Sequence, residues 1–331
     1  MDQVLLLLLI IFAAGVAFDF INGFHDTANA IATVVATRVL ALRTAIIMAA
    51  VFNVFGAMSG TAVAKTVGEG LVAADGVTQE VVLAALLGAI GWNLLTWYYG
   101  IPSSSSHALI GGLLGAGAAH AGFAVWEWDG IRKTLEALVG SPLIGFAGGF
   151  VLIVSVTWLT HRMRPQAGQQ LFRYLQLGSS GFMAFSHGSN DAQKTMGILT
   201  LALYSAGRID TFEVPFWVVV LAALALGAGT AAGGRRIIHT MGDKIIKLQP
   251  IHGFAAETSA ASVIYAASHL GFPVSTTHVI SSSIMGVGAA RGRTAVRWGV
   301  ARQIVIAWVL TIPACALSAA AFYLPVTLVF G

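Results

Sequence analysis

Two short stretches of the chain bring the same polar residue types together inside otherwise apolar sequence. Residues Asn22 to Asp26 read Asn-Gly-Phe-His-Asp, and in the second half of the chain His187 to Asp191 read His-Gly-Ser-Asn-Asp. A carboxylate is costly to place in apolar surroundings and is normally kept there to handle an ion or a proton. Asp26 and Asp191, with the nearby Asn29, therefore have the chemistry of oxygen ligands for sodium or of a proton relay.

The glycine in each stretch bears on the local backbone. Gly23 and Gly188 permit a helix to unwind at that point, so we expect interrupted helices there. An alternative for Asp26 and Asp191 is that they only pair with neighbouring cations or cap broken helices. Two copies of one costly group favour a shared function over that alternative.

A second pair of stretches is rich in hydroxyl groups. Pro102 precedes the serines 103 to 106 and His107, and in the second half Pro273 precedes Val274, Ser275, Thr276, Thr277 and His278. A proline fits the first turn of a helix, where the free backbone amides form the positive end of the helix dipole. Hydroxyls and free amides at a helix start predict an anion site. Simple N-capping is the alternative, although it needs only one hydroxyl at each site.

Carboxylates beside an anion site repel the anion unless a cation binds as well. Moving a divalent anion into a cell with a negative interior costs about 2.3 kcal/mol per charge per 100 mV, so uptake requires positive charge to move with it. The chain has no Gly-x-x-x-x-Gly-Lys-Ser/Thr stretch, which excludes ATP as an energy source bound by this chain. These residues predict an anion carrier that is coupled to a cation.

The composition places these motifs in a membrane. Of the 331 residues, 57% are hydrophobic and only 10% are charged, whereas soluble domains carry about 25% charge. Uncharged intervals long enough to span a bilayer predict ten main segments. The interval 81–126 must cross twice with a break at Gly100 and Pro102, and 248–290 does the same around Pro273.

The single cysteine, Cys315, excludes a disulfide framework, and the few scattered basic residues exclude a nucleic-acid surface.

The distribution of Lys and Arg predicts the orientation. When the predicted loops are numbered along the chain, one alternate set contains twelve basic residues and the other contains four. Basic residues concentrate in cytoplasmic loops. We therefore expect both termini to lie on the non-cytoplasmic side of a multi-pass protein of the cell inner membrane.

The paired motifs indicate an internal duplication. Two motifs recur in the same order, which divides the chain into halves 1–165 and 166–331, each with about five segments. An odd number of segments inverts the second copy in the membrane. The predicted fold is an all-α polytopic membrane protein of two inverted-topology repeats, with interrupted helices and helical hairpins at the centre and a shared site near the bilayer midplane.

Three stretches resemble the signatures of the inorganic phosphate transporter (PiT) family, bacterial low-affinity type. They are Gly23 to Ala30 (GFHDTANA), Gly188 to Asp191 (GSND) and Val274 to His278 (VSTTH). The resemblance implies a secondary symporter that takes up inorganic phosphate by alternating access, as a homodimer. It implies no enzyme activity, no structural metal and no cofactor besides a co-transported proton, sodium ion or metal-phosphate complex. Some relatives carry sulfate, which stays open as an alternative substrate.

The motifs and the resemblance together give two sets of expected site residues. Those expected to bind phosphate are Ser103, Ser104, Ser105, Ser106, Ser275, Thr276, Thr277, His25, Asn190 and Lys194. Those expected to handle the coupling cation or proton are Asp26, Asn29, Asp191, Asn22, His187 and Glu257.

Lys194 departs from the family pattern, because it stands where Asn29 stands in the first half. A Lys ammonium supplies a fixed positive charge where a second cation otherwise binds. We therefore expect coupling to a proton or a metal-phosphate complex rather than to two sodium ions, with His25 and His187 able to carry protons. A salt bridge from Lys194 to Asp191 or Asp26 is the alternative.

Two further acids lie within the apolar stretches. Asp19 precedes Asp26 by seven residues on the same helical face, but the second half has Ala184 in its place. It is expected to be a local gate or an interface residue. Glu257 either handles the coupling ion or pairs with a nearby histidine.

Two other classes of membrane protein are less consistent with the motifs. An intramembrane serine protease needs one nucleophile and one base, whereas here every polar motif is doubled and no Gly-x-Ser-x-Gly stretch occurs. An anion channel does not need buried carboxylates beside separate anion sites. Saturable phosphate flux in liposomes distinguishes a carrier from both.

Overall fold

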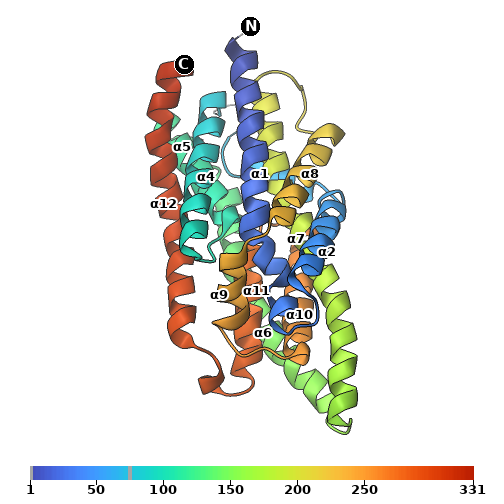
Figure 1. Cartoon of the computed structure of the whole chain (residues 1–331). Coiled ribbons are helices and arrows are strands. Elements are labelled where there is room, and N and C mark those ends of the chain that lie inside the picture. The colour runs from blue at the N-terminus through green and yellow to red at the C-terminus, as the bar shows by residue number, and fades with distance from the viewer. Residues whose placement is uncertain (1–2, 74–76) are drawn as a thin grey trace.

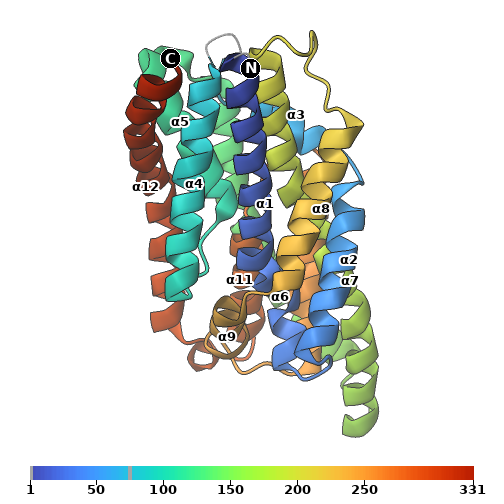
Figure 2. The ribbon, with the colours of Figure 1, turned by 45° about the horizontal axis from the view of Figure 1, so that its top comes forward.

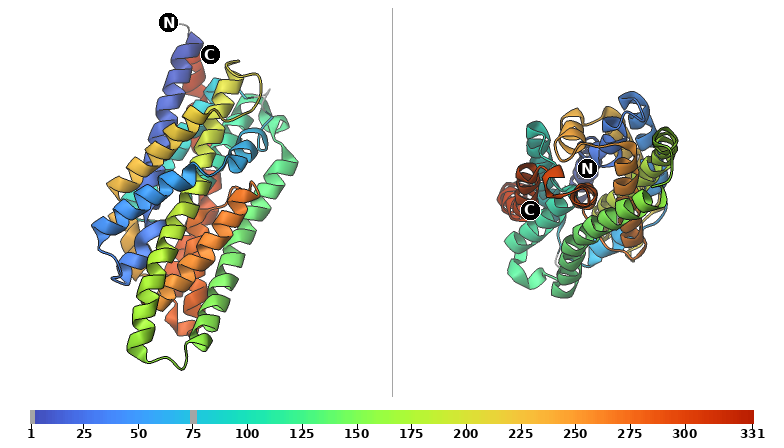
Figure 3. Two further views of the ribbon diagram at one scale, coloured as in Figure 1. Left: turned by 90° about the vertical axis from the view of Figure 1, so that its right-hand side faces the viewer. Right: turned by 90° about the horizontal axis from the view of Figure 1, so that it is seen from below.

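A computed structural model describes residues 3–73 and 77–331. These residues are almost entirely helical, apart from loops and an isolated β-bridge between Val72 and Trp126. The helices form an elongated bundle with both termini at the same end (Figures 1 and 3). Termini at one end agree with the prediction that both lie on the same side of a membrane.

The two halves contain the same order of helices. The first half has α1 (Gln3–Ala36), α2 (Leu42–Ala57), α3 (Ala62–Glu69), α4 (Gln79–Tyr99), α5 (Ser105–Ala121), the short 3-10 helix η2 (Gly122–Val125) and α6 (Trp128–Leu159). The second half has α7 (Pro165–Ser205), α8 (Phe216–Ala232), α9 (Arg235–Asp243), α10 (Pro250–His269), α11 (Thr276–Ala289), η3 (Arg293–Ala295) and α12 (Trp298–Phe330). Each half thus runs through a long helix, a bent pair, a helical hairpin and a second long helix.

Length and apolarity identify fewer spans than the ten expected. Five helices of the described chain qualify by themselves, namely α1, α4, α5 continued by η2, α6 and α12. The count becomes seven when the bent pairs α2 with α3 and α8 with α9 are each taken as one span. The other predicted segments fall short for physical reasons: α7 and α10 carry buried polar residues, and α11 has only 14 residues.

The expected breaks at Gly100 and around Pro273 are confirmed as the turns of two helical hairpins. Gly100 ends α4 with φ +65°, and Gly271 follows α10 with φ +75°. Glycine adopts this left-handed conformation without steric cost. The prolines, however, do not lie in the first helical turn as predicted, because α5 and α11 begin at Ser105 and Thr276, each three residues after its proline. The N-cap serine, not the proline, sets each helix start.

The predicted unwinding at Gly23 and Gly188 is wrong. α1 and α7 continue through both glycines without a break. Both glycines instead allow neighbouring helices to approach closely. A Cβ atom at Gly23 would lie 2.4 Å from the backbone oxygen of Leu226 in α8, and one at Gly188 would lie 2.2 Å from that of Asn53 in α2. Close helix packing through small residues is a common solution within membranes.

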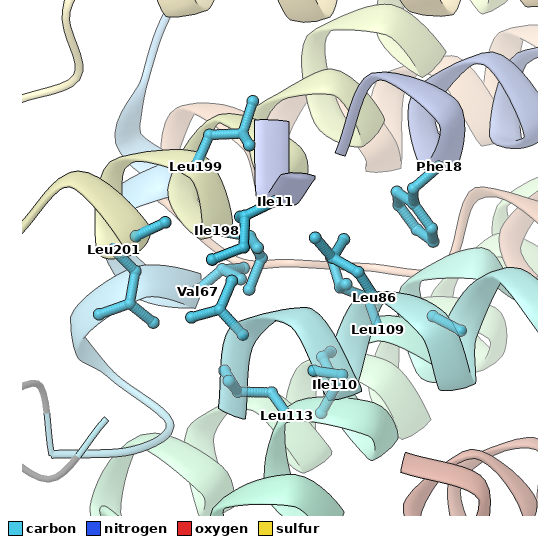
Figure 4. Packing of buried hydrophobic residues seen from close by; sticks show 14 of the residues in the cluster. Ile11, Phe18, Val67, Leu86, Leu109, Ile110, Leu113, Ile198, Leu199 and Leu201 are labelled. Carbon is cyan, nitrogen blue, oxygen red and sulfur yellow. The ribbon is translucent and has the colours of Figure 1, made fainter. Parts of the chain in front are cut away.

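The interior is divided into two apolar clusters with a polar layer between them. The outer cluster, at the end with the termini, includes Ile11, Phe18 and Leu199 (Figure 4). The inner cluster, at the other end, includes Ala28 and Ile246. The paired motifs lie between the two clusters, where α1 runs between α4 and α8 (Figure 2). The fold therefore encloses the polar motifs with apolar packing on both sides.

Candidate functional site

The start of each hairpin's second helix bonds to the polar stretch of the long helix in the same half. In the first half, Ser105 Oγ of α5 donates to Asn22 Oδ1 at 2.7 Å and to Asp26 Oδ2 at 2.9 Å, both on α1. In the second half, Thr276 Oγ1 of α11 donates to Asp191 Oδ2 of α7 at 2.9 Å. Ser105 and Thr276 occupy the same position in the two hydroxyl-rich stretches. The two carboxylates thus have equivalent hydroxyl partners.

A second set of contacts crosses between the halves. Asn29 Nδ2 of α1 donates to Thr277 Oγ1 of α11 at 2.8 Å. At the equivalent place, Lys194 Nζ of α7 donates to Ser106 Oγ of α5. Lys194 also donates to the carbonyl oxygen of Val274 at 3.0 Å. Each long helix therefore holds the hairpin of its own half and that of the other half.

Acids from both halves meet at the centre. One ligand atom each from Asp26, His187 and Asp191 lie within 4.8 Å of one another, and all three residues are buried. Lys194 pairs with Asp191, and His25 Nδ1 lies 2.6 Å from Asp26 Oδ1. The predicted alternative for Lys194, a salt bridge to Asp191, is thus present. The single Lys194 ammonium compensates only one of the two carboxylates. The remaining group of oxygen and nitrogen ligands suits a small cation or a proton.

His25 and Asn190 occupy equivalent places and bond to residues that the sequence motifs did not reveal. His25 Nε2 lies 3.1 Å from Thr96 Oγ1, near the end of α4. Asn190 Nδ2 donates to Ser268 Oγ at 2.9 Å, near the end of α10. Thr96 lies six residues before Pro102, whereas Ser268 lies five residues before Pro273, so the residue that corresponds to Thr96 is Ala267 and comparison of the two halves does not pair these hydroxyls.

Two of the predicted phosphate ligands act as helix caps. Ser104 Oγ accepts the backbone N–H of His107 at 3.1 Å, and Ser275 Oγ accepts that of His278 at 3.2 Å. This is the N-capping that was the alternative to anion binding, now assigned to one serine at each helix. The remaining hydroxyls have different partners: Ser103 Oγ, for example, donates to Thr96 Oγ1 at 2.8 Å.

The starts of α5 and α11 lie against each other. Ser106 Oγ donates to the carbonyl oxygen of Val274 at 3.1 Å. The imidazole rings of His107 and His278 meet edge to face with their centroids 4.3 Å apart. Two helix N-termini at one place present their amide groups and positive dipole ends together, which favours an anion.

Some buried polar atoms at this site have no hydrogen-bond partner among the described residues. They include Oδ1 of Asn29, Oδ1 of Asn190 and Oγ of Ser189. Buried polar atoms usually have a partner, so these unpaired atoms are available to a ligand or to water at this site. Asn29 follows Asp26 by three residues on α1, and Asn190 directly precedes Asp191 on α7, so each asparagine lies close to one of the central carboxylates in the sequence.

Glu257 lies apart from this centre. Its carboxylate accepts hydrogen bonds from Thr33 Oγ1 at 2.5 Å, Ser179 Oγ at 2.5 Å and Gln176 Nε2 at 3.0 Å. Thr33 follows Asp26 by seven residues along α1, which places Glu257 about 10 Å further toward the inner end. No pattern in the sequence connects these three donors with Glu257, because they come from two other helices.

Comparison with known proteins identifies relatives over the whole chain. The model of the phosphate transporter family matches residues 22–319. A probable low-affinity inorganic phosphate transporter of Rhizobium meliloti is 52% identical, over 98% of this chain and 97% of its own length. A protein of the same description from Bacillus subtilis is 48% identical over 100% of both chains. A solved structure described as the sodium-dependent phosphate transporter has a TM-score of 0.89 at 27% identity, covering 98% of this chain and 99% of that one.

Proposed function

Because this chain belongs to the phosphate transporter family, we propose that it takes up inorganic phosphate across the cell membrane together with a proton, by alternating access. Transport of phosphate follows from the family and its relatives. The observation that supports cation coupling is the central group itself, where carboxylates from both halves lie beside two helix N-termini.

Phosphate binds, in this proposal, where the starts of α5 and α11 meet. The groups that favour an anion there are the backbone amides of both helix starts, the hydroxyls of Ser105, Ser106, Thr276 and Thr277, and the Lys194 ammonium. Ser105 and Thr276 now donate to the two Asp carboxylates. When a cation or proton satisfies those carboxylates, both hydroxyls become free to donate to phosphate, which makes binding of the two solutes interdependent.

The coupling proton is handled by Asp26, Asp191 and the two histidines beside them. Lys194 already supplies one positive charge at the position equivalent to Asn29, so fewer mobile cations are needed at the centre. Sodium remains the competing coupling ion, because the solved relative is described as sodium-dependent. Glu257 and its three donors form a separate acid site on the inner side of the centre.

An inverted repeat supports alternating access in this proposal. The order of helices is the same in both halves, and the contacts of Asp26, Asn29 and His25 on α1 correspond to those of Asp191, Lys194 and Asn190 on α7. Inverted halves exchange roles when the carrier turns from one side to the other.

The placement of both termini outside rests on the Lys and Arg distribution, and the homodimer rests on the family resemblance.

Sulfate is the competing substrate, and it differs from phosphate in its protons. Near neutral pH phosphate keeps a proton, so its O–H group can donate a hydrogen bond to an Asp carboxylate. Sulfate is fully deprotonated and has no such donor. We therefore expect excess sulfate to leave the uptake of labelled phosphate into proteoliposomes almost unchanged, while excess unlabelled phosphate abolishes it. Equal inhibition by both anions would assign the site to tetrahedral dianions in general.

A further inference from the structure

Asp19 is a buried acid outside the central group. It lies on α1, and its side chain is fully buried. Oδ1 accepts a hydrogen bond from Thr195 Oγ1 of α7 at 2.6 Å, and Oδ2 has no hydrogen-bond partner among the described residues. Asp19 precedes Asp26 by seven residues, which places it about 10 Å toward the end with the termini. It therefore occupies the outer side of the centre, as Glu257 occupies the inner side.

The charged groups nearest to Asp19 belong to α7. Asp191 and Lys194 both interact with it electrostatically. The Lys194 ammonium, however, is already paired with Asp191. In the described part of the chain, no ion pair includes Asp19. Asp19 thus has an acid as one neighbour, and its other neighbour is a cation that is already paired with Asp191.

The other helices packed against α1 offer no compensating cation near Asp19. α8 contains no ionisable side chain, and α4 carries only Glu80 at its outer end and two tyrosines at its inner end. α2 has an exposed arginine, Arg43, at its inner end. α9, α10 and α11 contact the inner part of α1, for example through Gly242, Glu257 and Thr277. A buried carboxyl in such surroundings is most easily accommodated with a proton bound.

Apolar packing covers Asp19 on the side of the termini. Ile11 and Phe18 of α1 and Leu199 of α7 belong to the outer cluster and are buried, with Ile11 near Leu199 and Phe18 further along α1 (Figure 4). A Cβ atom at Gly15 would lie 2.6 Å from a methyl carbon of Leu199, so α1 and α7 are close together at that level. Water from the end with the termini can therefore reach Asp19 only when this packing opens.

We propose that Asp19 is the outer proton-binding site of this carrier, a role that rests on the proton-coupled uptake proposed above. When the outer cluster opens, Oδ2 takes a proton from water, and the negative charge of Asp19 is removed from the neighbourhood of Asp191. Phosphate then binds without repulsion from a third carboxylate. After the carrier opens inward, Asp19 passes its proton to the carboxylates of the central group, and from there the proton leaves to the cytoplasm with the phosphate. The second half has Ala184 at the equivalent position, so this site belongs to one side of the membrane only.

The test separates proton-driven accumulation from phosphate exchange, using the full chain in proteoliposomes. Accumulation is measured as uptake of labelled phosphate under a gradient that is acid outside. Exchange is measured with equal phosphate and equal pH on both sides, where label moves without net proton transport. Asp19→Asn keeps an oxygen that accepts the bond from Thr195. We expect this variant to lose accumulation to the level of empty liposomes while its exchange rate stays close to that of the wild type.

Thr195→Val is the matched control, because it removes the hydrogen bond between α1 and α7 that Asp19→Asn keeps, and it leaves the carboxyl in place. It is expected to retain accumulation. Accumulation by Asp19→Asn at the wild-type level overturns the proposal, and so does equal loss of accumulation and exchange, which indicates a structural role. If the wild type itself exchanges phosphate but does not accumulate it under the pH gradient, the proposed proton coupling fails first, and the role of Asp19 fails with it.

Discussion

Replacing Asp191 by Asn is expected to reduce phosphate uptake about 100-fold or more, since breaking a buried ion pair costs roughly 3–5 kcal/mol and each 1.4 kcal/mol is a factor of ten. Asp191 pairs with Lys194, lies 3.0 Å from His187 Nε2 and accepts a bond from Thr276. The neutral Asn leaves the Lys194 ammonium buried without an anion. Uptake of labelled phosphate by proteoliposomes measures the loss.

Asp26→Asn is expected to reduce uptake to a similar degree but to affect stability less. Asp26 has no lysine partner among the described residues, and an Asn there still accepts the hydroxyl of Ser105. The thermal midpoint of the purified variants therefore distinguishes the two carboxylates: it falls for Asp191→Asn and stays near the wild-type value for Asp26→Asn. Adding Lys194→Met to Asp191→Asn removes the unpaired ammonium and is expected to restore the midpoint without restoring uptake.

Uptake by either single variant at the wild-type rate would contradict the assignment of both carboxylates to the transport site. Loss of uptake in Asp26→Asn accompanied by a large fall in its midpoint would also contradict it, because the carboxylate would then be needed for folding rather than for transport. Size-exclusion chromatography of each variant in detergent confirms that the compared samples are monodisperse.

Lys194→Asn is expected to make phosphate uptake dependent on added sodium. The substitution removes the ammonium that bonds to Asp191, Ser106 and the Val274 carbonyl, and it introduces the side chain found at the equivalent Asn29. The buried Asp191 then needs another cation, and the amide oxygen of Asn is a suitable ligand for sodium. Without sodium we expect uptake to fall about tenfold or more, the effect of losing at least 1.4 kcal/mol of ion pairing.

Two further substitutions at the same position are matched controls. Lys194→Arg keeps the positive charge and is expected to remain independent of sodium. Lys194→Met supplies neither a charge nor an oxygen, so it is expected to be inactive with and without sodium. Sodium-independent uptake by Lys194→Asn at the wild-type rate would show that the ammonium is not the built-in cation of the site.

The sequence motifs predicted the centre of the site better than the geometry of the helices around it. The recurrence of both motifs in the two halves led to the expectation of a shared central site, and Ser105 and Thr276 bond to Asp26 and Asp191. The breaks at Gly100 and around Pro273 were also predicted, because a long uncharged interval has to turn. Both results follow from residue types that recur in the same order in the two halves.

The failed predictions concern features that depend on packing between distant helices. Gly23 and Gly188 suggested unwinding, but each lies in a continuous helix against a backbone from another part of the chain. Pro102 and Pro273 suggested helix starts, whereas the N-cap serines that follow determine them. The donors around Glu257 were missed because no spacing links them to it. The spacing of residues within a motif predicts their contacts with one another. The close approach of two distant helices produces no comparable pattern in the sequence.

The most direct test of the account is the driving force for uptake by the wild-type protein. Purified protein in proteoliposomes is given labelled phosphate with either a pH gradient that is acid outside or a sodium gradient at equal pH, at the same membrane potential. The fixed charge of Lys194 and the carboxyls at the centre predict accumulation with the pH gradient in the complete absence of sodium. Accumulation only with the sodium gradient would contradict the account.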